Sequence, residues 1–422
     1  MAGSPAVGQW RRRVPDVLRE RNFLSYFVGQ GLSQLGDAIL PVALAFAVLD
    51  LTGSPSALGL VLAAGFVPGV VFLLVGGVLA DRVQRRRLMV VCDVVRAGSQ
   101  VTQGVLVLTG DATLVSLIAL QLVWGTAAAF FRPASTGLVA EMVEPGRLSQ
   151  ANGMIALTDS IAYTVGPAIA GVLIAVASPG VAIVADGVTF AASAVALLLI
   201  RVPRLVATPA GEPSSLLRDL RAGWHEFSSR SWLWTMVAWA ATFNLLALPA
   251  MIVLGPVVAH ERLGGAPAWA AISACSGLGA VIGGVVGIRL RSRYVLRPAF
   301  LPLGLYGLPL LLLAIPSPVP LIAAAAVLAG IGVAMFNVFL ATAMQQQIPL
   351  SALSRVSAYD WLCSIALVPV GQAAIGPVAE LTSVPAVLVV AAAWMLFSPL
   401  VLYSARAARD LPATAVADPA SR

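Results

Sequence analysis

The sequence predicts an all-α membrane protein with twelve transmembrane helices in two pseudo-symmetric six-helix bundles. Three observations predict this fold: an apolar composition, repeated apolar stretches of spanning length, and arginines that recur in alternate connections. Hydrophobic residues make up 59% and charged residues 11% of the 422 residues. Soluble domains carry about 25% charged residues, so the composition excludes an ordinary soluble protein.

Apolar stretches of spanning length follow one another along most of the chain. A helix needs about 20 mostly apolar residues to cross the hydrocarbon core of a membrane. Two of the divisions between stretches rest on short breaks, "ASPG" after Val176 and "PSPVP" after Ile315. The predicted spans are 23–49, 57–79, 88–109, 113–131, 152–177, 180–200, 232–258, 268–289, 298–315, 319–342, 358–381 and 384–403.

Arginine placement agrees with this count. All 26 basic residues are Arg, and positive charge is concentrated in cytoplasmic connections. Arginines occur at the N-terminus, at 82–87, 132–147, 201–230, 289–297 and 355, and after 404, whereas 50–56, 110–112, 178–179 and 316–318 contain none. The outer connection 259–267 has only Arg262. The alternation predicts a multi-pass protein of a bacterial cytoplasmic (inner) membrane with both termini in the cytoplasm.

The long connection in the middle divides the chain. Its residues Leu216, Leu217, Leu220, Trp224 and Phe227 share one helical face, which predicts a short amphipathic helix on the inner membrane surface. The predicted domains are a cytoplasmic tail 1–22, a bundle 23–200, a cytoplasmic linker 201–231, a bundle 232–403 and a cytoplasmic tail 404–422.

The two predicted bundles carry similar landmarks in the same order. "RNFL" at 21–24 aligns with "RSWL" at 230–233, and "GGVLADRVQRR" at 76–86 aligns with "GGVVGIRLRSR" at 283–293. Two six-helix halves of parallel topology are the repeat architecture of major facilitator transporters.

Several motifs resemble those of the major facilitator superfamily. "GGVLADRVQRRRLM" resembles its signature between helices two and three, with Gln84 where a Gly is usual. "GPAIAG" at 166–171 resembles the Gly-Pro motif of the exporter branch. The stretches 127–153 and 345–362 resemble the branch that contains macrolide efflux proteins and the enterobactin exporter. The resemblance covers roughly 21–403 and does not specify a substrate.

The resemblance implies a conformational gate at the cytoplasmic ends of helices two and three and at the Gly-Pro pair. The alternative for Asp81 and Arg85 is an ordinary surface pair one helical turn apart, and the alternative for Gly166 is simple close packing. The gate residues are Gly77, Asp81, Arg82, Arg85, Arg86, Gly166 and Pro167.

Acids inside predicted spans are the candidates for proton coupling, because intramembrane charges are costly and usually functional. Asp37 lies near the middle of the first span and is the first candidate, followed by Asp186 and Asp159. An arginine from another helix is the alternative partner of Asp37. Asp93 has Arg96 one turn away, and this pair is either structural or functional.

The resemblance also implies that helices one, four, seven and ten line a substrate cavity. Aromatic and apolar walls with few charges suit an amphipathic substrate, whereas helix packing is the alternative role for each residue. The cavity candidates are Gln30, Gln34, Gln121, Trp124, Phe243, Asn244, Phe336 and Asn337. Gly279, Gly283 and Gly287 recur every four residues, which predicts close helix packing.

These features predict a secondary active transporter that exports an amphipathic organic compound by alternating access, coupled to protons. A non-transporting receptor or a lipid flippase on the same scaffold remains an alternative. A membrane enzyme is disfavoured because His225 and His260 lie in separate connections and no catalytic motif occurs. The expected partners are a small-molecule substrate, protons and the lipid bilayer, with no nucleic acid, cofactor or metal. We expect a monomer.

Overall fold

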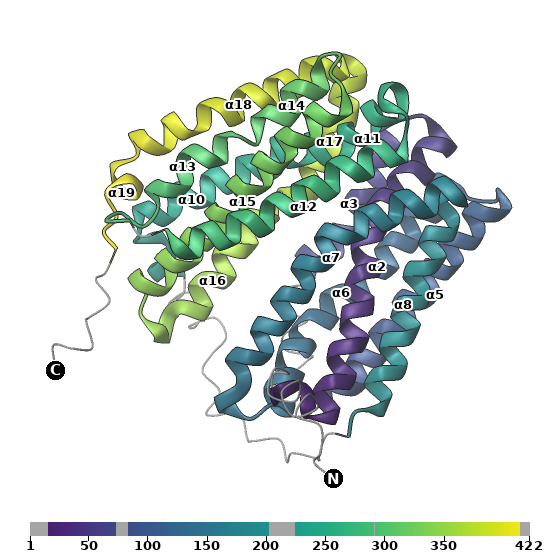
Figure 1. Ribbon diagram of the computed structural model, residues 1–422, viewed down its shortest axis with the longest axis horizontal. Coiled ribbons are helices and arrows are strands. Elements are labelled where there is room, and N and C mark those ends of the chain that lie inside the picture. The colour runs from purple at the N-terminus through teal and green to yellow at the C-terminus, as the bar shows by residue number, and fades with distance from the viewer. Residues whose placement is uncertain (1–15, 73–82, 202–223, 291, 414–422) are drawn as a thin grey trace, which may run out of the picture. The chain divides into compact units, whose positions relative to one another are not determined.

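The computed structural model describes residues 16–72, 83–201, 224–290 and 292–413 (Figure 1). Within these ranges the regular secondary structure consists of helices. The β-type pairing found there is an isolated bridge between Tyr294 and Pro412. A helix bonds its backbone groups within its own segment, which is what lipid surroundings require. The helical fold class expected from the sequence is therefore present.

The described residues of the first part of the chain form six long helices after a 3₁₀ turn at Asp16–Arg19. They are α2 Arg21–Thr52, α3 Pro55–Val71, α5 Arg85–Thr109, α6 Leu114–Met142, α7 Leu148–Val176 and α8 Pro179–Leu199, with the turn η2 Pro145–Arg147 before α7. Ser178 accepts a hydrogen bond from Val181 N at the start of α8, and Pro179 occupies the first turn of that helix. These residues place the break between α7 and α8 where "ASPG" predicts it.

The second part begins with a helix that changes its winding several times. It runs as α10 Ser231–Thr242, η3 Phe243–Ala247, η4 Ala250–Leu254, α11 Gly255–Val258 and η5 Ala259–Leu263, where the three η segments are π-helical. The remaining helices are α12 Ala266–Arg289, α13 Arg297–Gly304, α14 Gly307–Ala314, α15 Val319–Gln347, α16 Leu350–Ile365, α17 Val368–Leu381, α18 Val384–Ser404 and α19 Arg406–Arg409.

Among the described residues, ten helical stretches are long and apolar enough to cross a membrane. α13 and α14 together make one of them, and so does the winding helix from Ser231 to Leu263. Two predicted spans fall outside this set for separate reasons. α3 has 17 residues, Pro55–Val71, and is short for a span, whereas α5 carries several polar side chains that lower its mean hydropathy.

The chain separates into two compact units. Unit 1 contains Met1–Ala47 and Ala64–Pro209, and unit 2 contains Val48–Ala63 and Ala210–Arg422. Each unit is described by itself below.

Segment 48–63 is fastened to the rest of unit 2 by Glu380 of α17. Its Oε1 accepts hydrogen bonds from Ser54 Oγ at 2.8 Å and from Ser56 N at 3.2 Å. Asp50 also pairs with His260, with 3.1 Å between Oδ1 and Nε2. A Cβ on Gly376 would lie 2.5 Å from Ser56 Cα, so the start of α3 and α17 touch through their backbones.

The described end of the linker, from Trp224 onward, packs against unit 2. Trp224 is exposed, but Phe227 is fully buried and its ring lies 5.0 Å from Trp234 and 6.0 Å from Tyr359. The aromatic end of the linker therefore packs against helices of unit 2. Leu216, Leu217 and Leu220 lie outside the described residues.

The C-terminal end of the described chain is tied to the start of α13. Arg297 Nη2 lies 2.5 Å from Asp410 Oδ1, and Arg409 donates to the same carboxylate. Hydrogen bonds from Arg409 and Arg297 lower the pKa of Asp410 to about 2. Tyr294 receives a cation–π contact from Arg297 at 3.7 Å.

The glycines of α12 allow it to lie directly on α15, and the two helices run side by side (Figure 1). A Cβ on Gly279 would lie 2.0 Å from Val327 O, and one on Gly283 would lie 2.4 Å from Ile331 O. Gly287 faces Val338 at 3.3 Å. The packing role predicted for these three glycines is confirmed.

Gly283→Leu should therefore disrupt unit 2, because the new side chain meets the α15 backbone and overpacking typically costs about 1–3 kcal/mol or more. The matched control is Gly284→Leu, since a Cβ there has open space. Fluorescence-detected size-exclusion chromatography after detergent extraction measures the folded fraction. A monodisperse Gly283→Leu peak equal to that of the control would contradict this packing.

Candidate functional site

Unit 1 contains a buried network of polar side chains on three helices. Asp93 of α5 is fully buried, and its Oδ2 accepts a hydrogen bond from Ser193 Oγ of α8 at 2.7 Å. Gln30 Nε2 of α2 donates to the same hydroxyl at 2.9 Å. Arg96 donates to Asp93 Oδ1. A buried polar group is stable only when it is bonded, and this network satisfies the carboxylate of Asp93 on both oxygens.

Arg96 is the cation of this network. Its side chain is 5% exposed, and its Cζ lies 4.0 Å from the ring centre of Phe131 and 4.2 Å from that of Phe190. Cation–π contacts of this kind stabilise a desolvated guanidinium. Arg96 Nη1 is also 3.9 Å from Asp37 Oδ2. Both pairings considered for this arginine, with Asp93 and with Asp37, are therefore present.

The carboxyl group of Asp37 has fewer polar contacts than that of Asp93. Its side chain is 28% exposed, and its Oδ1 is buried without a hydrogen-bond partner. Gln34, a cavity candidate almost one turn before Asp37, is half-buried and does not bond that oxygen. A carboxyl with one weak ion pair and one unbonded oxygen is less stabilised as an anion than one with two full hydrogen bonds.

Asp186 of α8 is fully buried and lies against α2. A Cβ on Gly36 would come within 2.3 Å of Asp186 Oδ1, so the carboxyl occupies the space beside the residue preceding Asp37. Neither of its oxygens has a hydrogen-bond partner.

Asp159 lies on α7, is half-buried, and has an unbonded buried Oδ1. Arg132 of α6 is within electrostatic range of both Asp159 and Asp37. Unit 1 therefore brings the three acids proposed for proton coupling onto neighbouring helices, with Arg96 and Arg132 nearby.

A polar stripe along α5 extends this network. Asp93, Arg96, Gln100 and Gln103 are buried, and their spacing of three, four and three residues places them on one helix face. Gln121 Nε2 of α6 donates to Gln103 Oε1 at 3.0 Å, whereas both polar atoms of Gln100 lack a partner. Gln100 and Gln103 were not predicted from the sequence, although this spacing marks them.

Unit 2 brings two of the predicted cavity residues together in an aromatic cluster. Phe243 stacks on Trp239 with 5.4 Å between ring centres, and Trp239 lies 5.0 Å from Phe336. Tyr306 meets Phe243 edge-on at 4.9 Å. Trp239 and Tyr306 were not among the candidates, although Trp239 lies one turn before Phe243 in the same predicted span.

The other cavity candidates differ in their surroundings. Asn244 Nδ2 donates to Ser364 O at 2.8 Å and so joins two helices of unit 2, whereas Asn337 is exposed. Trp124 of α6 is half-buried and its Nε1 has no partner. Gln30 and Gln121 are buried and bonded within unit 1.

Two of the predicted gate residues contact neighbouring helices of unit 1. Arg85 Nη1 pairs with Glu141 Oε1 of α6 at 2.9 Å, and Arg86 Nη1 donates to Ile200 O at 2.6 Å after the last turn of α8. Glu141 was not recognised from the sequence. Gly77, Asp81 and Arg82 lie outside the described residues.

The Gly-Pro pair lies inside a continuous α7. Gly166 is buried, and a Cβ there would lie 2.4 Å from Ala38 Cβ of α2. Gly166 is therefore needed for close packing beside Asp37, and a hinge at Pro167 stays a prediction.

Unit 2 also contains a half-buried acid and a buried amide that were not among the sequence candidates. Asp360 of α16 has one buried oxygen without a partner, and Gln372 of α17 is fully buried with neither polar atom bonded. A backbone oxygen, Gln372 O, lies 2.1 Å from where a Cβ on Gly59 would be. Single polar residues in apolar spans are the signal that marks them.

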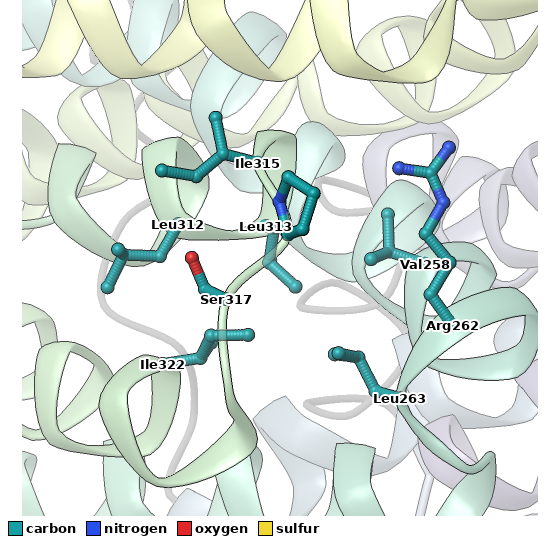
Figure 2. Close-up of a pocket in the computed structure, with 9 residues that line it drawn as sticks. Val258, Arg262, Leu263, Leu312, Leu313, Ile315, Ser317 and Ile322 are labelled. Carbon is teal, nitrogen blue, oxygen red and sulfur yellow. The ribbon is translucent and has the colours of Figure 1, made fainter.

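A cavity of about 180 Å³ lies at one end of unit 2 (Figure 2). Val258, Arg262 and Leu263 line one side, and Leu312, Leu313, residues 315–317 and Ile322 line the other. Its walls are mostly apolar and include none of the predicted cavity residues. It is therefore separate from the aromatic cluster.

Comparison with known proteins identifies similar membrane transporters. The family profile described as Major Facilitator Superfamily matches residues 26–366. Macrolide efflux protein A of Streptococcus pyogenes is 26% identical over 267 residues, which cover 63% of this chain and 65% of that protein. The match thus spans less than two thirds of that relative's length.

Two further similarities cover more of the chain. Multidrug efflux pump Tap of Mycolicibacterium fortuitum is 28% identical over 357 residues, 82% of this chain and 86% of that protein. The crystal structure of the nucleoside transporter NupG superposes with a TM-score of 0.71 at 13% identity, covering 91% of this chain and 98% of that chain. At that identity the structural likeness shows the fold alone.

Proposed function

Because the chain belongs to the Major Facilitator Superfamily, whose profile matches residues 26–366, we propose that it is a proton-coupled exporter of an amphipathic organic compound. The chain is a multi-pass membrane protein with the fold of a transporter, and the similar proteins named for efflux favour outward transport. The observation that carries the proton coupling is the group of acids on neighbouring helices of unit 1, where Asp37 is only partly paired.

The architecture that we propose has twelve transmembrane helices in two pseudo-symmetric six-helix bundles. The ten spanning stretches, together with α3 and α5, support this count. The bacterial origin of the similar efflux proteins supports a bacterial cytoplasmic membrane. Both termini then lie in the cytoplasm, and the protein acts as a monomer.

The aromatic cluster supports a substrate with an apolar body. Trp239, Phe243, Tyr306 and Phe336 supply large rings with few charges. Such surfaces bind flat or flexible apolar groups, while a small number of polar groups determine orientation. A drug, a siderophore and a natural product all fit this chemistry.

In the proposed cycle, the ionised Asp37 favours a cationic or hydrogen-bonding substrate, and protonation from outside releases it. Asp186 and Asp159 are the alternative carriers of the proton. A receptor or a lipid flippase on the same scaffold would not accumulate substrate in response to a pH gradient, so a transport assay separates these alternatives.

The topology predicts that Ser54 faces outside and Gln84 faces the cytoplasm. Single cysteines at these positions, in a background without Cys92, Cys275 and Cys363, should therefore react differently with an impermeant thiol reagent on intact cells. We expect labelling at position 54 alone, and labelling at both positions after permeabilisation. Equal labelling on intact cells would overturn the proposed orientation.

For the gate, Asp81→Asn should reduce transport by at least tenfold while the amount of inserted protein stays unchanged, because the family resemblance assigns this acid to the contact that holds one conformation. Quantitative blotting of membranes provides the abundance. A variant that transports at the rate of the unmodified protein would reduce the motif to a topology signal.

Asp37→Asn preserves the shape of the side chain and removes its titration. In inverted vesicles without ATP, it should lose pH-driven accumulation of a fluorescent lipophilic cation while exchange between equal concentrations persists. Asp159→Asn serves as the comparison within the same unit. If the Asp37→Asn variant still concentrates the cation at the original rate, another residue couples the proton.

A further inference from the structure

The buried charges around Asp37 do not balance. Three carboxyl groups, those of Asp37, Asp93 and Asp186, lie near the guanidinium of Arg96. Asp93 and Arg96 neutralise each other, and Ser193 bonds the remaining oxygen of Asp93. Removing a lone charge from water is costly, so the other two carboxyls cannot both be ionised without a further partner.

Arg96 is placed where it can become that partner. Its Nη1 is 3.9 Å from Asp37 Oδ2, and a charge-assisted hydrogen bond of this type spans about 2.7–2.9 Å. A movement of about 1 Å therefore closes the contact. The rings of Phe131 and Phe190 lie against the guanidinium at 4.0 and 4.2 Å and restrict it to small displacements.

On its other side, the guanidinium of Arg96 is bonded to Asp93, which gives it a second stable position. Ser193 donates a hydrogen bond to Asp93 and accepts one from the side-chain amide of Gln30, so the position of Asp93 is fixed. Gln30 and Asp37 lie on the same helix, α2, two turns apart. A shift of α2 thus changes the Asp37 distance while the contact with Asp93 remains.

We propose that Arg96 is a positioning residue whose guanidinium is shared between Asp93 and Asp37, and that it closes onto Asp37 when that carboxyl loses its proton to the cytoplasm. This inference rests on the proposed function, in which Asp37 carries the proton. When Asp37 is protonated, Arg96 is held by Asp93 alone. Asp93 thereby prevents Arg96 from neutralising Asp37 permanently, which would block its reprotonation.

Other charged and titratable groups face Asp37 from the helices packed around it. Asp186 belongs to α8, Arg132 to α6, and Asp159 and the neutral Tyr163 to α7. Arg132 also attracts the Asp37 carboxylate, but the ion pair within 4 Å that the described residues show for Asp37 is the one with Arg96. Arg132→Gln should thus shift the titration in the same direction as Arg96→Gln, by less.

The test measures the titration of Asp37 itself in the purified, full-length protein, without any substrate. Infrared difference spectra collected across pH follow protonated carboxyl bands, and the band that Asp37→Asn removes belongs to Asp37. Arg96→Gln should raise the midpoint of this band by about one pH unit or more, the size expected when a neighbouring cation is removed. Asp93→Asn should lower it, because Arg96 is then free to bind Asp37.

A double-mutant cycle separates sharing from simple charge removal. If Asp93 acts on Asp37 through Arg96, the shift caused by Asp93→Asn should largely disappear when Arg96→Gln is present. Ser99→Ala on the same helix is the structural control, since Ser99 bonds a backbone carbonyl of α6 and should leave the midpoint unchanged. Should Arg96→Gln not fold, Arg96→Lys provides the readout. A lysine cannot bridge two carboxylates as a guanidinium does, so it should raise the midpoint by a smaller amount.

An unchanged midpoint in Arg96→Gln, additive shifts in the cycle, or the absence of a titrating Asp37 band would each overturn this inference. Failure of the proposed function gives a different result, namely Asp37→Asn vesicles that still concentrate the cation. The two outcomes are measured in separate experiments and are distinguishable.

Discussion

The requirement that polar groups inside lipid find partners within the protein shapes the whole chain. It explains why the described residues build helices, since a helix satisfies its own backbone. It also explains why the buried side chains of unit 1 form a connected network. Asp93 is bonded on both oxygens and Arg96 is covered by two aromatic rings. Where the partners are incomplete, as at Asp37 and Asp186, the structure holds groups whose charge can change.

The two units distribute their chemistry unequally. Among the described residues, the fully or nearly fully buried charged side chains are Asp93, Arg96 and Asp186, all in unit 1. Unit 2 instead contributes the cluster of Trp239, Phe243, Tyr306 and Phe336 together with π-helical turns in the same helix as two of these rings. π-Helical segments are rare and often occur at functional sites. The buried charged side chains thus belong to unit 1, and the aromatic cluster belongs to unit 2.

Much of the fold follows from the sequence, because apolar length and the placement of Arg, Pro and Gly are local signals. The break at Ser178–Pro179 and the packing glycines of α12 are examples. The site follows less completely. Asp37 and Arg96 are separated by 59 positions in the printed sequence, and their approach depends on how α2 and α5 pack. The sequence identified both residues, and only tertiary structure determines that one guanidinium serves two acids.

The hydrogen bonds from Ser54 and Ser56 to Glu380 also have a consequence for biosynthesis. These partners are 326 and 324 residues apart, and ribosomes add about 5–20 residues per second. On the order of 16–65 s therefore separates synthesis of the start of α3 from synthesis of Glu380, whose carboxylate accepts its hydrogen bonds. During that interval Ser54 supplies local acceptors to Ala57 N and Leu58 N, and the hydrogen bond still missing is the one from Ser56 N to Glu380. Assembly of this corner is a late event even though its first residues are made early.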